Sequence, residues 1–149
     1  MLFSLVASGL WILTSLYAIG YMRGHHEENQ TRFFAFFAVA ISAALAAAFS
    51  GNMLTLFFSY EVLTLSTYPL VTHHRTPEAL RAGRIYMGIL LSTSIGLLLL
   101  GVLLTYHVAG TLSFIQGGIL AGHATPLMTG ILLFLYAYGT GKAALMPIH

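Results

Sequence analysis

Residues 51–72 read GNMLTLFFSYEVLTLSTYPLVT. This stretch is apolar and long enough to cross a bilayer as one helix. Its single charged side chain is Glu61, which at about 1.5 Å per residue from Met53 lies roughly 12 Å into a hydrocarbon layer about 30 Å thick. A charge at that depth costs about 2.5–3.5 kcal/mol even on the gentler insertion scales, so an intramembrane carboxylate is a candidate functional group. One other apolar span carries a charge at comparable depth, Lys142.

The composition predicts an all-α integral membrane protein. Of the 149 residues, 58% are hydrophobic and 7% are charged, whereas about a quarter of the residues in soluble domains are charged. The absence of cysteine excludes a disulfide framework and thiolate metal or iron–sulfur sites. The six Lys and Arg residues are scattered between apolar spans, so they form no basic patch for nucleic acid.

Five apolar spans have the length that a bilayer requires, and together they predict a single transmembrane helical domain over residues 1–149. Thr76-Pro77-Glu78 combines an N-cap residue, a first-position proline and a first-turn acid, so the fourth helix should begin before its membrane span. Pro147 cannot donate a backbone hydrogen bond, so the fifth helix should break near Lys142. The five spans are 2–22, 33–50, 53–72, 84–106 and 127–148.

Arginine residues outside the spans gather in alternate loops, which predicts the orientation. The second and fourth loops contain no Lys or Arg. By the positive-inside rule, loops 23–32 and 73–83 are cytoplasmic and the N-terminus begins outside. The arginines concerned are Arg23 and Arg32 in the first loop, and Arg75, Arg81 and Arg84 in or beside the third.

Polar residues follow Glu61 at helical spacing, namely Thr64, Tyr68 and Thr72. Such a stripe could hold ordered water that leads to the carboxylate. Alternatively, Thr64 and Tyr68 bond only to neighbouring backbone, and the sequence leaves both interpretations open. His73 and His74 follow the stripe and are candidates for proton uptake, or else are simply solvated at the interface.

Glu61 and Lys142 are the candidate catalytic pair. Burial raises the pKa of an acid and lowers that of an amine, while an opposite charge close by reverses both shifts. The charge on each group therefore depends on their separation, and a change at a distance can move a proton. The alternatives are a structural, neutral Glu61 and a Lys142 that extends to the interface. No metal or cofactor is expected, because adjacent histidines in the 25–28 loop point apart.

Three runs resemble a known family: YAIGYM at 17–22, the helix from Asn52 to FSYE at 58–61, and GKAALMPIH at 141–149. They resemble the antiporter-like subunits of respiratory complex I, membrane-bound hydrogenases and Mrp-type cation/proton antiporters, and the D subunit of Mrp antiporters most closely. The resemblance implies that the spans match the family's third to seventh helices. It also makes Glu61 and Lys142 the first half of a proton path. A complete member has two inverted repeats, so the resemblance covers the N-terminal part only.

The resemblance implies a subunit, or a fragment of one, that translocates protons and monovalent cations, with protons and sodium as candidate ions. Its partners would be other membrane subunits in the plasma membrane of a prokaryote. In a complex I-like assembly, it would belong to an NADH:quinone oxidoreductase without carrying the redox site. The alternatives are a structural membrane subunit or a truncated remnant without transport of its own. A quinone-reacting subunit has no support in the sequence.

Overall fold

The computed structural model describes residues 2–140, and every regular element in this part of the chain is helical. The predicted all-α class is therefore confirmed. A π-helical segment, η1, joins α4 to α5 without a break in the helix. The elements are α1 (Leu2–Gly24), α2 (Gln30–Ala48), α3 (Met53–Val71), α4 (Pro77–Thr93), η1 (Ser94–Leu99), α5 (Leu100–Ala109) and α6 (Pro126–Gly139).

Among residues 2–140, four helices are long and apolar enough to cross a membrane: α1, α2, α3 and the continuous helix Pro77–Ala109, which has 33 residues. The shorter apolar helix α6 begins the fifth predicted span. The fourth helix begins as the sequence predicts, because the Thr76 side chain accepts a hydrogen bond from the Ala79 N–H at 3.1 Å and Pro77 follows the cap. The break predicted near Lys142 falls outside the described residues.

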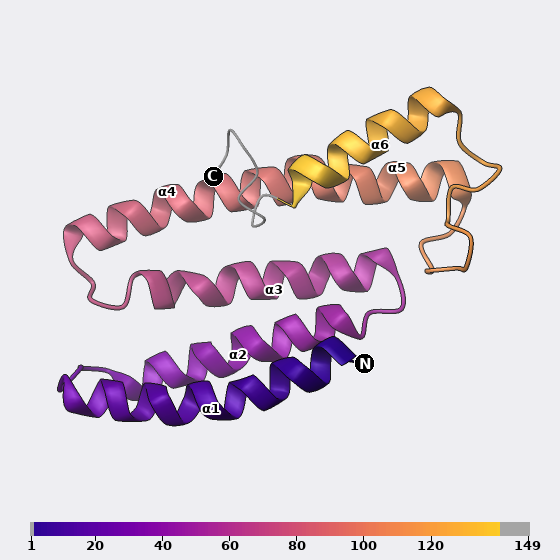
Figure 1. Ribbon diagram of the computed structural model, residues 1–149. Helices are drawn as coiled ribbons and strands as arrows, with labels where there is room; N and C mark the ends of the chain where they lie inside the picture. Colours follow the sequence, from indigo (N-terminus) through magenta and orange to yellow (C-terminus); the bar gives the residue numbers. More distant parts are fainter. Residues whose placement is uncertain (1, 141–149) are drawn as a thin grey trace.

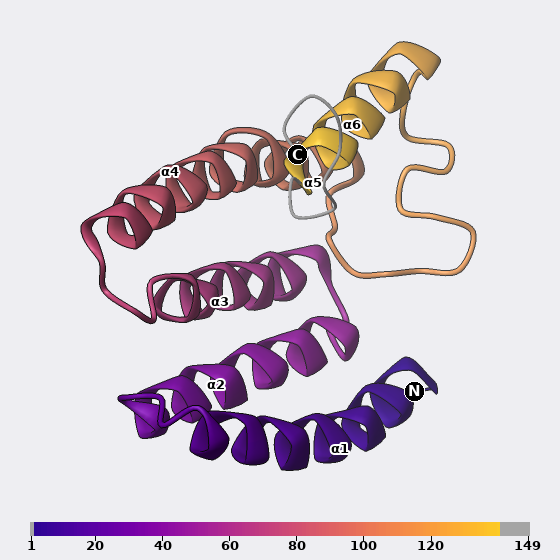
Figure 2. The same cartoon turned by 60° about the vertical axis from the view of Figure 1, so that its left-hand side comes forward.

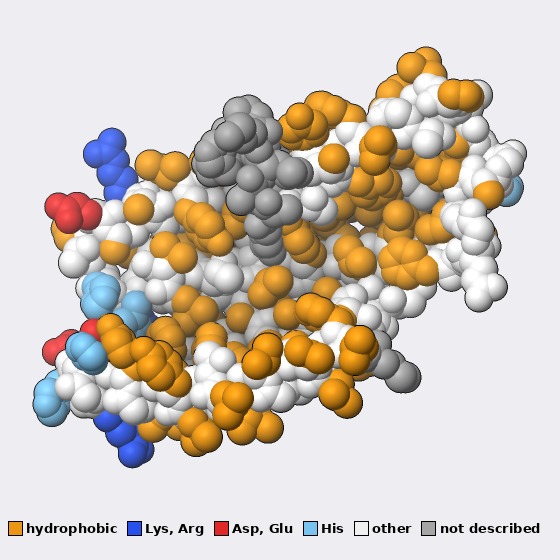
Figure 3. Space-filling model, viewed as in Figure 1, with side chains coloured by type: hydrophobic (Ala, Val, Ile, Leu, Met, Phe, Trp, Pro, Cys, Tyr) orange, Lys and Arg blue, Asp and Glu red, His pale blue; other side chains and the backbone are white. Residues whose placement is uncertain are grey.

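The helices run side by side and their connections alternate between two ends of the molecule (Figures 1 and 2). The α1–α2 and α3–α4 loops lie at one end, and the α2–α3 and α5–α6 loops lie at the other. In the face shown in Figure 3, the acidic and arginine side chains gather at the first of these ends. This arrangement gives the described helices the charge asymmetry of a membrane protein.

The contacts between helices depend on small residues and a few ring pairs. Alanine-rich α2 packs closely along α3, as expected where small side chains let backbones approach in lipid. By contrast, α1 buries only Ser4 and Met22, and it meets α2 through the rings of Trp11 and Phe37, whose centroids are 4.1 Å apart. Most of the apolar surface of α1 is therefore left to lipid or to another protein.

Close approach of backbones decides how α6 docks on η1. A Cβ added to Gly139 would lie 2.5 Å from the Leu98 backbone nitrogen and 2.7 Å from its Cα. Leu98 and Ser94 are themselves buried in this contact region. A π-helical segment is rare and often marks a functional site. The end of α6 therefore packs on the one described segment where the long helix departs from α-helical geometry.

We expect Gly139→Ala to lower the free energy of unfolding by about 1–3 kcal/mol, because the new methyl group would collide with backbone atoms. The matched control is Gly130→Ala on the same helix, where an added Cβ meets nothing within 4 Å. The free energy of unfolding of both variants is measured in detergent, with circular dichroism as the signal. Equal stability of the two variants would contradict the packing of α6 on η1.

Candidate functional site

Glu61 lies on the face of α3 that is turned toward the α4–α6 half of the bundle. Near the end of α3, a Cβ added to Gly83 of α4 would collide with Thr72 Cγ2 and lie 3.2 Å from Tyr68 Cε2. These two residues share a helical face with Glu61 and with Thr64, which is fully buried. The face that carries Glu61 is therefore an interior one.

The beginning of α3 makes a second contact on the same face. Tyr136 of α6 donates a hydrogen bond to Met53 Sδ at 3.4 Å. Phe57, one turn before Glu61, is buried. Glu61 thus lies between two helix contacts, one with α4 and one with α6.

The segment η1 runs opposite Glu61. The long helix is antiparallel to α3 (Figure 1), and Gly83 faces Tyr68 and Thr72. At equal rise per residue, the position level with Glu61 is about nine residues beyond Gly83, where η1 begins. In agreement, α3 contacts η1, and Ser94 at its start is fully buried. The irregular turn of the long helix is therefore level with the carboxylate.

One oxygen of the Glu61 side chain, Oε1, is buried and has no hydrogen-bond partner among the described residues. Nearly all buried polar atoms in proteins have a partner, and each exception needs a specific explanation. A carboxylate kept in a membrane span without a local partner is poorly suited to holding helices together. Glu61 is therefore an exception on this helix that needs such an explanation.

The hydroxyl groups of the predicted stripe bond to their own helix. Thr64 Oγ1 donates to the Tyr60 carbonyl at 2.9 Å, and Thr72 Oγ1 donates to the Tyr68 carbonyl at 2.8 Å. Each hydroxyl keeps acceptor lone pairs after donating its hydrogen. The hydroxyls of Thr64 and Thr72 are therefore satisfied as donors without water, yet their oxygens can still accept.

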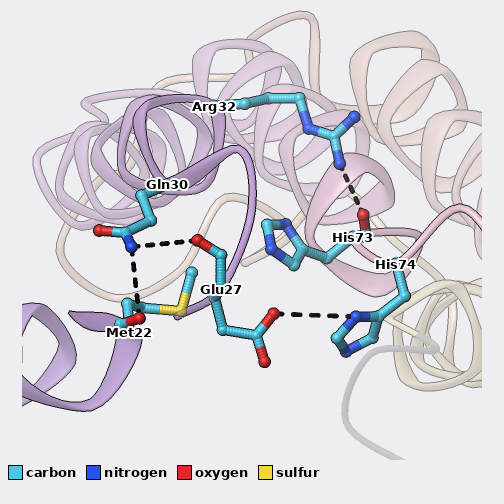
Figure 4. A network of polar contacts seen from close by, with 6 residues as sticks. All are labelled: Met22, Glu27, Gln30, Arg32, His73 and His74. Carbon is cyan, nitrogen blue, oxygen red and sulfur yellow. Dashed lines mark hydrogen bonds and ion pairs between the residues drawn. The ribbon is translucent and has the colours of Figure 1, made fainter. Parts of the chain in front are cut away.

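Beyond the stripe, the predicted histidines meet the first loop at the charged end (Figure 4). Arg32 Nη2 donates to the His73 carbonyl at 2.8 Å, and His74 Nδ1 lies 3.9 Å from Glu27 Oε2. Gln30 Nε2 closes the first loop by donating to the Glu27 carbonyl at 3.0 Å. These contacts tie the end of α3 to the α1–α2 loop.

A second polar network, at the opposite end, was not predicted from the sequence. The Tyr136 hydroxyl lies 2.6 Å from Thr105 Oγ1, which itself donates to the Gly101 carbonyl at 2.8 Å. Thr105 and Tyr136 have one hydroxyl hydrogen each, so two hydrogens are shared among three contacts: with the Gly101 carbonyl, between the two hydroxyls, and with Met53 Sδ. The two residues border a cavity of about 590 Å³ whose other lining residues are mainly apolar.

Comparison with known proteins places these helices in a family. The family model described as "NADH:quinone oxidoreductase/Mrp antiporter, TM" matches residues 50–149. The chain belongs to this family. The matched region begins beside α3, so it includes both Glu61 and Lys142.

Relatives extend the similarity to the first helices. The chain is 28% identical over 146 residues to the "Putative antiporter subunit mnhD2" of Staphylococcus aureus strains JH9, Newman and NCTC 8325. Each alignment covers 95% of this chain and 29% of the relative, so the chain spans under a third of the length of these curated relatives. The predicted likeness to D subunits is confirmed. No solved structure gave a significant match.

Within this antiporter family member, the structure brings together part of the predicted site. Glu61, Thr64 and Tyr68 share the interior face of α3, and His73 and His74 follow at its end. Lys142 falls outside the described residues. Sequence reasoning missed Thr105 and Tyr136 because their pairing joins α5 to α6 across a long loop, a contact that no local pattern marks.

We expect Tyr136→Phe and Thr105→Val each to destabilise the fold, with a coupling energy of about 1 kcal/mol in a double-mutant cycle, since the two side chains share one hydrogen bond. The free energies of unfolding of the four proteins in the cycle are measured in detergent. Tyr138→Phe is the control on the same helix, where the ring packs on Phe134 with centroids 4.7 Å apart. Additive effects of the two substitutions would show that the hydroxyl pair contributes nothing.

Proposed function

We propose that this protein is a proton- and cation-translocating membrane subunit, or part of one, in an Mrp antiporter or complex I-like assembly, with Glu61 as its proton-binding group. The observation that carries the proposal is the buried, unpartnered Oε1 of Glu61 on the interior face of α3. Membership of the family supports translocation as the general activity. The unpartnered Oε1 is a free position on the carboxylate at which a proton can be bound.

Lys142 is the proposed partner of Glu61. The described chain ends at Thr140, directly after Gly139 meets Leu98 of η1. Because η1 runs opposite Glu61, the chain approaches the level of the carboxylate two residues before the lysine. An opposite charge brought close favours both ionised forms; when the two groups are drawn apart, Lys142 sheds its proton or Glu61 takes one up. Alternation between these states would couple a movement of the helices to proton transfer.

The proposed proton route to Glu61 starts at His73 and His74 and follows Tyr68 and Thr64. Imidazole groups exchange protons near neutral pH. The hydroxyls of Thr64 and Thr72 already donate their hydrogens to backbone carbonyls but can still accept a hydrogen bond. Proton transfer along the stripe therefore requires intervening water. Protons, and sodium as the exchanged cation, are the proposed ions. No cofactor is assigned to this part of the assembly.

The proposed setting is the plasma membrane of a prokaryote, where other membrane subunits complete the transport path. The charged end of the molecule, with loops 23–32 and 73–83, faces the cytoplasm in this proposal, and the N-terminus lies outside. The relatives are more than three times as long as the aligned region, so translocation is assigned to the assembly that contains these helices.

We expect Glu61→Gln and Lys142→Ala each to abolish coupled proton/cation exchange in membrane vesicles that carry the complemented assembly, because either change removes one charge of the pair. Exchange is measured from the cation-induced change of a pH-sensitive dye. The control is Glu78→Gln, which makes the same charge change at an exposed position of α4.

Immunoblotting of the purified assembly shows that the variants insert and assemble. A purely structural subunit behaves differently: the same substitutions would then lower the amount of assembly and leave exchange per assembled complex unchanged. That result, or full exchange in either variant, would reject the proposal.

Orientation is tested with single cysteines, since the natural chain contains none. We expect Glu28→Cys to react with a membrane-impermeant maleimide only in inside-out vesicles. Gln116→Cys, at an exposed position of the opposite end, should react only in right-side-out cells. The reverse pattern would show that the arginine-bearing loops face outward.

A further inference from the structure

Two neighbouring cavities lie at the charged end of the molecule, outside the proposed proton-binding site. The first has a volume of about 500 Å³ and a polar wall. It is formed by the α1–α2 loop and the α3–α4 loop. Its lining residues are His25, His26, Glu27, Glu28, Asn29, His73, His74 and Arg75.

The second cavity has a volume of about 420 Å³ and runs from the same place along the helices. Its wall is mainly apolar and aromatic, with Tyr17 and Tyr21 on α1, Phe37 on α2, and Leu70 at the end of α3. Glu27, His73 and His74 line both cavities, so the polar space and the apolar one adjoin at these three residues.

We propose that the two cavities together bind one membrane phospholipid with a primary-ammonium headgroup, of the phosphatidylethanolamine class. The headgroup occupies the polar cavity and an acyl chain follows the apolar one. The joined cavities match the division of a phospholipid into a charged head and an apolar tail. Their position also fits, because the charged loops mark the membrane boundary, where headgroups lie.

Charge complementarity selects the headgroup. The polar cavity carries both signs, because Glu27, Glu28 and Arg75 are all among its lining residues. An ammonium group offers three hydrogen-bond donors to the carboxylates, while the phosphate can accept from the guanidinium and the imidazole rings. The wall also holds a buried polar atom without a partner among the described residues, His73 Nδ1.

Other occupants fit the same wall less well. An anionic headgroup would face two carboxylates at close range, which is repulsive. A choline headgroup has no N–H to donate to them. For a metal ion, no group of three suitable side chains comes together among residues 2–140. A water-filled cavity would leave the aromatic and aliphatic wall of the second cavity wet, which is unfavourable.

The loose packing of α1 explains why the space exists. Over its second half, α1 has no buried side chain until Met22, and Tyr17 and Tyr21 remain exposed to 71% and 47%. Tyrosine is enriched at membrane interfaces, where its ring contacts acyl chains and its hydroxyl reaches headgroups. A bound lipid would fill the gap between α1 and the end of α3.

Native mass spectrometry of the full chain in detergent tests the proposal, with palmitoyl-oleoyl phosphatidylethanolamine, -choline and -glycerol added separately. We expect the ethanolamine lipid to bind about tenfold more tightly than the choline lipid, which is the effect of one charge-assisted hydrogen bond. Glu27→Gln combined with Glu28→Gln should remove this preference. Glu78→Gln, an equal charge change on the same end but outside the cavity, should retain it.

A second pair of variants tests the apolar cavity without changing charge. Ala18 lines the apolar cavity, so Ala18→Phe should weaken the binding of all three lipids by about tenfold. Ala35→Phe, at an exposed position outside the cavity, should leave their binding unchanged. Circular dichroism confirms that each variant is folded. Equal binding of the three lipids, preference for the glycerol lipid, or equal losses in variant and control would each overturn the proposal. The assay measures no transport, so its outcome is independent of the function proposed above.

Discussion

The scarcity of water in the hydrocarbon layer is the constraint on which the structure depends. Polar groups at that depth must find partners within the protein. On α3, the hydroxyls of Ser59, Thr64 and Thr72 meet this requirement by bonding to carbonyls of their own helix. Glu61 does not, since its buried Oε1 has no partner among the described residues. The buried Oε1 of this one carboxylate therefore distinguishes Glu61 from the hydroxyl groups of the same helix, which bond to their own backbone.

Helix boundaries and the interior face of α3 were predictable from sequence because they depend on local chemistry. Thr76 caps the fourth helix as its neighbours in the sequence indicate, and polar spacing identified the face that carries Glu61. The π-helical turn at Ser94–Leu99 was not predicted, because it depends on packing against α6, a contact between distant parts of the chain. The pairing of Glu61 with Lys142 remains a prediction, since the lysine lies outside the described residues.

Small residues give the second half of the bundle its shape. Gly83 admits the side chains of Tyr68 and Thr72, and Gly139 admits the backbone of Leu98. The first contact lies about three turns before η1 on the long helix, and the second lies within η1 itself. A movement of α6 relative to η1 would therefore be transmitted at the level of the carboxylate. Packing this close resists gradual deformation and favours a change between discrete arrangements.

The two ends of the molecule differ in the groups that could carry protons to or from Glu61. Toward the charged end, the face of Glu61 continues through Thr64 and Tyr68 to two histidines that can exchange protons. Toward the other end it reaches Met53 and the closed hydroxyl pair of Tyr136 and Thr105, beside a mainly apolar cavity. The Tyr136 hydroxyl is already in contact with Thr105 and Met53, and no acidic, basic or histidine side chain is among the described residues that line that cavity. The proposed proton route therefore leads to Glu61 from the charged end, although His107 and His123 also lie at the opposite end of the molecule. In this proposal the rest of the assembly completes the path on the far side of Glu61, since the relatives are more than three times as long as the aligned region.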